Sequence, residues 1–135
     1  MLNKGYLFTA ALTLLATSLS VQAEDKAEAA FSNELIQCAA YYQISSSMIM
    51  GMNAPQMKPV GERLKTSAIE AEKIAGSYLP AEQVVADIAT AKEQQLASLN
   101  GKGNLGPLMG KYKEVCKKAV LDPKARLDYW AMVMM

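Results

Sequence analysis

The chain has 135 residues, 51% of them hydrophobic and 20% charged, which suits one compact domain and is too short for two of typical size. Its formal net charge is only +1, so bulk polyanion binding is not expected and nucleic acid is excluded as a partner. Histidine is absent, which excludes Ser-His-Asp, Cys-His and histidine–metal sites.

The first 23 residues have the three-part pattern of a cleavable signal peptide. Lys4 supplies the positive start, residues 7–19 form an apolar stretch, and Val21 and Ala23 are small residues at positions three and one before the cut. This stretch is shorter than the ~20 residues that span a bilayer, which disfavours the alternative of an uncleaved membrane anchor. We therefore expect a periplasmic or secreted product, residues 24–135, forming a single helical domain without a transmembrane segment.

The mature part shows helical periodicity and no alternating pattern typical of strands. We expect the first helix to begin with Asp25 or Ser32 as its cap and to end at Gly51, before Pro55. Its apolar positions recur at spacings of three and four, which predicts one buried stripe: Phe31, Leu35, Cys38, Tyr42, Ser45, Ile49 and Met52.

Four further helices are predicted, over about residues 60–78, 80–99, 108–121 and a short segment after residue 122. Pro80 suits the first turn of the third helix, and Asp122 followed by Pro123 predicts a capped start for the fifth. The third helix should bury one stripe: Val84, Val85, Ile88, Ala91, Leu96 and Leu99. The sequence thus predicts an all-α fold, a small up-down bundle of four to five helices.

Two cysteines, Cys38 and Cys116, lie in the mature part, each on the apolar stripe of its own helix. In an oxidising compartment such a pair usually forms a disulfide, although two free buried thiols are the alternative. A disulfide would make the first and fourth helices direct neighbours, with Cα atoms roughly 5–6 Å apart.

Methionine is the compositional oddity, with nine in the chain. Met48, Met50, Met52 and Met57 cluster near the end of the first helix, and thioethers are soft ligands suited to Cu(I). Core packing is the stronger interpretation, because Met48 and Met52 share a helix face while Met50 points elsewhere. We expect no cofactor, and copper is the alternative.

Four residues are candidates for binding a partner: Tyr41, Trp130, Lys111 and Lys118. Core packing is the stronger interpretation for the aromatic pair; if both were instead exposed together with the terminal methionines, they would form an apolar patch of the kind that binds partners. For the lysines a solvated face is the ordinary explanation, with Lys118 near the negative end of its helix, and attraction to an anionic lipid or cell-wall polymer is the functional one.

These observations favour an exported helical interaction protein, which binds, inhibits or protects another exported protein or contacts the cell-envelope surface. Its expected architecture is analogous to that of small periplasmic acid-stress chaperones, which are helical with one disulfide joining two helices; no shared motif accompanies this analogy. Cu(I) binding through methionine is the runner-up, and an enzyme without a recognisable motif is the third hypothesis.

Overall fold

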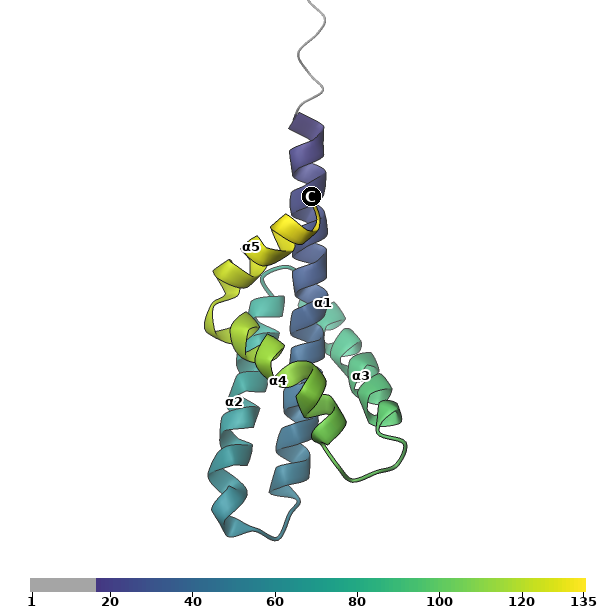
Figure 1. The fold of residues 1–135 in the computed structure, drawn as a ribbon, viewed down its shortest axis with the longest axis vertical. Helices are drawn as coiled ribbons and strands as arrows, with labels where there is room; N and C mark the ends of the chain where they lie inside the picture. Colours follow the sequence, from purple (N-terminus) through teal and green to yellow (C-terminus); the bar gives the residue numbers. More distant parts are fainter. Residues whose placement is uncertain (1–16) are drawn as a thin grey trace, which may run out of the picture.

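The computed structural model describes residues 17–135, which form five α-helices and one 3-10 turn (Figure 1). The all-helical prediction is confirmed, and this part of the chain contains no strand. Most of the predicted signal peptide, residues 1–16, lies outside the described residues. The elements are α1 (Thr17–Met50), η1 (Pro55–Met57), α2 (Lys58–Ala75), α3 (Ala81–Ser98), α4 (Gly106–Leu121) and α5 (Pro123–Val133).

The long helix α1 is the centre of the domain, and the other four helices all pack on it (Figure 1). The predicted stripe of α1 is buried from Phe31 to Ser45, but Ile36, Ala40 and Ile44 on other sides are buried as well. A helix enclosed on all sides is expected to be apolar all round rather than along one stripe. The middle of α1 is therefore a core helix.

The predicted end of α1 is confirmed and its predicted start is wrong. The helix begins at Thr17, and the Ser32 hydroxyl donates to the Glu28 carbonyl inside the helix, 2.6 Å away, instead of capping it. Residues 17–23 of the predicted signal peptide form the first turns of the same helix. Met52 lies beyond the last helical residue and is 55% exposed, so it does not continue the stripe.

Small residues let α2 approach α1 closely. Ala68, Ala71 and Ala75 are buried on the inner face of α2. A Cβ built on the buried Gly61 would lie 2.6 Å from Met50 Sδ, so glycine allows the two helices to meet there. The Ser46 hydroxyl donates to the Gly61 carbonyl at 2.9 Å, which fixes the register of the pair.

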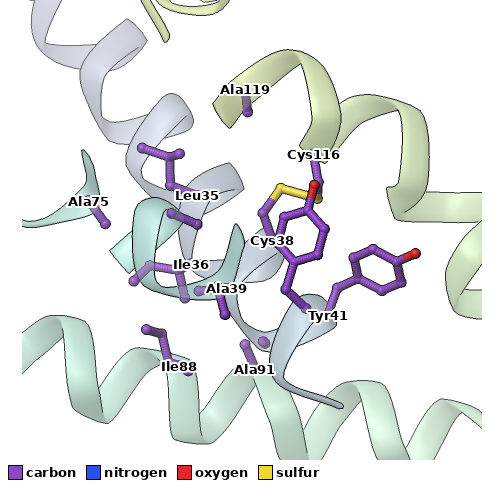
Figure 2. Packing of buried hydrophobic residues seen from close by; sticks show 14 of the residues in the cluster. Leu35, Ile36, Cys38, Ala39, Tyr41, Ala75, Ile88, Ala91, Cys116 and Ala119 are labelled. Carbon is purple, nitrogen blue, oxygen red and sulfur yellow. A yellow bond between two sulfur atoms is a disulfide. The ribbon is translucent and has the colours of Figure 1, made fainter. Parts of the chain in front are cut away.

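The predicted disulfide is confirmed. Cys38 and Cys116 are joined, with Cα atoms 5.3 Å apart, and both residues are fully buried. Figure 2 shows the bond between α1 and α4 beside Tyr41, with Ile36 and Ala39 facing Ile88 and Ala91 of α3. The bond therefore holds α4 against the central helix.

The start of α3 and the burial of three of its residues differ from the prediction. Pro80 is the residue before the helix and not its first member. Val85 and Leu96 are 68% and 48% exposed, whereas Gln95 is buried at 3% exposure. The buried positions 84, 88, 91, 95 and 99 keep spacings of three and four, which residues 85 and 96 break.

The start of α5 is confirmed. The Asp122 carboxylate accepts a hydrogen bond from the Ala125 backbone N–H at 3.1 Å, and Pro123 occupies the first turn. None of the residues of α5 is fully buried.

Candidate functional site: an amide-lined groove

Tyr41, predicted to bind a partner, lies in the core. It is 3% exposed, and its ring stacks on that of Tyr112 with centroids 5.7 Å apart. Burial raises the pKa of Tyr41, and it raises the pKa of the adjacent Tyr42 to about 12. The predicted patch that joins Tyr41 to Trp130 is therefore not formed, because α4 and the disulfide cover Tyr41.

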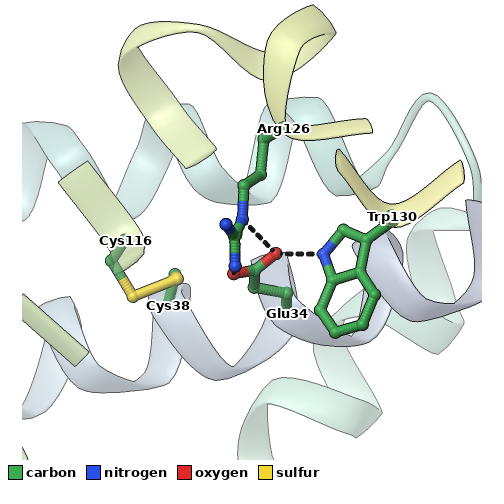
Figure 3. A network of polar contacts seen from close by, with 5 residues as sticks. All are labelled: Glu34, Cys38, Cys116, Arg126 and Trp130. Atoms are coloured by element: carbon green, nitrogen blue, oxygen red, sulfur yellow. Dashed lines mark hydrogen bonds and ion pairs between the residues drawn. A yellow bond between two sulfur atoms is a disulfide. The ribbon is translucent and has the colours of Figure 1, made fainter. Parts of the chain in front are cut away.

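Trp130 is half-buried and holds α5 to the central helix (Figure 3). Its indole N–H donates to the Glu34 carboxylate, which is buried in α1. Arg126 donates to the same carboxylate through Nε at 2.9 Å and Nη2 at 2.6 Å. This ion pair joins residues 92 positions apart and lies next to the disulfide. Charge-assisted bonds of this bidentate kind fix geometry as well as adding energy.

The two candidate lysines of α4 are exposed and border different pockets. Lys118 lines a pocket of about 590 Å³ between α4 and α5, together with Leu121 and Tyr129. Lys111 lines a pocket between α1, α3 and α4, and its Nζ lies 5.2 Å from the Tyr112 ring centroid. The structure does not bring these two cations into one site.

Two of the four candidate methionines share a pocket. Met50 and Met52 line a hollow of about 340 Å³ at the end of α1, whereas Met48 and Met57 do not line it. Because α1 ends at Met50, the expected pairing of Met48 with Met52 on one helix face does not occur. Within the described range, no three His, Cys, Asp or Glu side chains converge as a metal site.

The polar site that the structure presents most clearly is a groove along α1 between α3 and α4. Both of these helices pack on α1 rather than on each other, which leaves space between them. A pocket of about 620 Å³ lies there, and an adjoining pocket of about 430 Å³ lies between α1 and α3 alone; both are lined by Asn33, Gln37 and Gln94. We call the two pockets together the amide groove. Their volumes lie in the range usual for ligand sites.

Gln95 lies at the wall of the larger pocket and is fixed in orientation. Its Nε2 is 2.9 Å from the Gln37 backbone oxygen, which can only accept, so a donating nitrogen must stand there. The same Nε2 lies 3.0 Å from Gln37 Oε1. This arrangement leaves Gln95 Oε1 buried without a hydrogen-bond partner among the described residues. Ser45 Oγ is the other such atom, but a hydroxyl can rotate and this amide cannot.

These contacts also order Gln37. Its Oε1 accepts from Gln95 Nε2 and, at 3.4 Å, from the Tyr112 hydroxyl. Its own Nε2 makes no hydrogen bond within the described part of the chain, and Gln37 lines both pockets. One residue from each of α1, α3 and α4 thus forms a network that holds an amide donor in the amide groove.

Sequence reasoning missed this groove because it assigned Leu96 to the buried stripe in place of Gln95. The spacing of four residues from Ala91 to Gln95 was the available signal. Asn33 and Gln37 are likewise four residues apart, which puts both amides on one face of α1.

Comparison of the chain with protein-family models, with curated proteins and with solved structures finds no match. None of the helices between residues 17 and 135 is both long and apolar enough to cross a membrane.

Proposed function

We propose that the chain is an exported binding protein, whose helical domain recognises another exported protein or a cell-envelope component through the amide groove. The observation that carries this proposal is the buried, unpartnered Oε1 of Gln95 in a pocket wall. A buried polar atom without a partner costs about 1–3 kcal/mol. A buried polar atom of this kind calls for an explanation, and a bound ligand that supplies the missing donor is the one we propose.

The chemistry of the lining favours binding over catalysis. The groups shared by the two pockets are primary amides, which donate and accept hydrogen bonds but do not act as acids or bases at neutral pH. Catalytic sites depend on titratable groups that converge on one reacting atom. The single charged residue of each pocket, Asp87 in one and Lys111 in the other, does not meet that requirement.

The test is retention of envelope material by the immobilised, oxidised full chain. Gln94→Trp places a large ring between the two pockets, and Gln56→Trp makes the same change at an exposed site in η1, outside the groove. The wild type and Gln56→Trp should retain solubilised exported or envelope material. Gln94→Trp should retain at least tenfold less of this material than the wild type. Equal retention by all three chains, or none by the wild type, would refute the proposal.

A chaperone-like role is a second candidate, favoured by the way in which α5 is attached. Glu34 is the buried anchor for both Arg126 and Trp130, while Met132 and Val133 of α5 are 65% and 52% exposed. Loss of the Glu34 charge in Glu34→Gln would leave Arg126 without its anion and loosen α5. Suppressed aggregation of a client protein by Glu34→Gln at neutral pH would support this role, and an inert variant that binds no apolar dye would exclude it.

A further inference from the structure

We infer that the amide groove binds a neutral saccharide, an inference that rests on the proposed function and names its ligand class. The hydrogen-bonding capacity of the groove is the first reason. Gln95 Oε1 is buried without a donor, and Gln37 Nε2 makes no hydrogen bond within the described part of the chain. A sugar hydroxyl is both donor and acceptor, so neighbouring hydroxyls of one ring satisfy both side chains.

The charge of the groove is the second reason. Asn33, Gln37 and Gln94, which both pockets share, are neutral. Asp87 borders only the smaller pocket and Lys111 only the larger one, so the two charges are opposite and lie apart. A phosphate or carboxylate ligand would require converging cations, and a cationic ligand would require converging carboxylates. The lining therefore selects an uncharged polar molecule.

The apolar part of the lining suits the same ligand. Ile36 and Leu79 line the smaller pocket, and Pro107 and Leu108 line the larger one. The C–H faces of a pyranose ring can cover such surfaces while its hydroxyls reach the amides. Two adjoining pockets match a ligand of more than one sugar unit. Gln95 Oε1 is covered in the described structure, so binding of a hydroxyl there requires the side chains that cover it to move while Gln95 stays bonded to Gln37.

A polypeptide fits this lining less well. Peptides are recognised as an added strand at a sheet edge, as an amphipathic helix in an apolar groove, or as a proline-rich segment on aromatic side chains. Residues 17–135 offer no sheet edge, and amides form the centre of the groove. The only aromatic side chain in the larger pocket, Tyr112, already has one ring stacked on it.

The experiment is an NMR titration of the oxidised full chain that follows the side-chain amide resonances of Gln37 and Gln95. The probes are maltotriose, cellotriose and chitotriose as neutral saccharides, trigalacturonate as an anionic one, and a capped tri-alanine peptide. We expect at least one neutral saccharide to shift both amides. Gln95→Leu should weaken that binding at least tenfold, and Gln56→Trp should leave it unchanged.

Three results would overturn the ligand class: no shift with any of the three neutral saccharides, tighter binding of trigalacturonate or the peptide, or equal binding by Gln95→Leu. The retention assay separates this failure from failure of the proposed function. Envelope material retained by the wild type but not by Gln94→Trp, without saccharide binding, would refute only the ligand class. Absence of both retention and saccharide binding would refute both proposals.

Discussion

Gln95 of α3 donates its side-chain amide to the backbone carbonyl of Gln37 in the central helix, 2.9 Å away, and to the side-chain oxygen of the same residue. This contact joins two helices 58 positions apart in sequence and fixes which end of each amide faces inward. It leaves one buried acceptor unsatisfied and one donor presented to the amide groove. Two apolar side chains at these positions could join the helices without the free-energy cost of a buried, unpaired oxygen.

The Glu34–Arg126 ion pair should be essential to the stability of the domain. Glu34→Gln keeps the size of the side chain but leaves the largely buried guanidinium without its anion. Breaking such a pair from one side costs about 3 kcal/mol, and urea unfolding followed by circular dichroism measures this loss. Asp128→Asn, which breaks the exposed pair with Lys124, is the control and should change stability by less than about 0.5 kcal/mol. Similar losses in both variants would show that burial of Glu34 does not matter.

Reduction of the disulfide should destabilise the domain strongly. The bond spans 78 positions, and closing a loop of this length reduces the entropy of the unfolded chain by an amount worth about 4–5 kcal/mol at 25 °C. The measurement compares urea unfolding of the oxidised chain, the reduced chain and a Cys38→Ala, Cys116→Ala double variant. We expect both thiol-free and reduced chains to unfold at much lower urea. An unchanged midpoint would mean that helix packing alone holds α4 in place.

Stability should fall in alkali because of Tyr42. Burial raises the pKa of Tyr42 from 10.0 to about 12, so between these values the folded chain keeps a proton that the unfolded chain releases. The contribution of Tyr42 is therefore fully present below pH 10 and is lost progressively as the pH rises toward 12. Tyrosinate absorbance together with unfolding at each pH measures this loss. Tyr42→Phe should show a smaller alkaline loss, and an identical pH profile for both chains would contradict the assignment.

The helices and the disulfide could be predicted from the sequence, whereas the amide groove could not. The stripes, prolines and the Asp122 cap predicted the helices, and two cysteines on apolar stripes predicted which helices are neighbours. The central position of α1 was not predicted, because one helix seen alone does not reveal how many neighbours cover it. Tyr41 is an example: the sequence left open whether it is exposed or packed in the core, and Tyr112 of α4 covers it. Burial of Glu34 and Gln95 depends on partners 92 and 58 positions away, which periodicity cannot identify.

The most direct test of the account is the amount of envelope material retained per mole of folded Gln95→Leu chain, relative to the wild type. Leucine removes both the unpartnered oxygen and the amide that orders Gln37, so the free domain should keep its stability to within about 1 kcal/mol. The account predicts that retention nevertheless falls at least tenfold. Undiminished retention by a folded Gln95→Leu chain would contradict it.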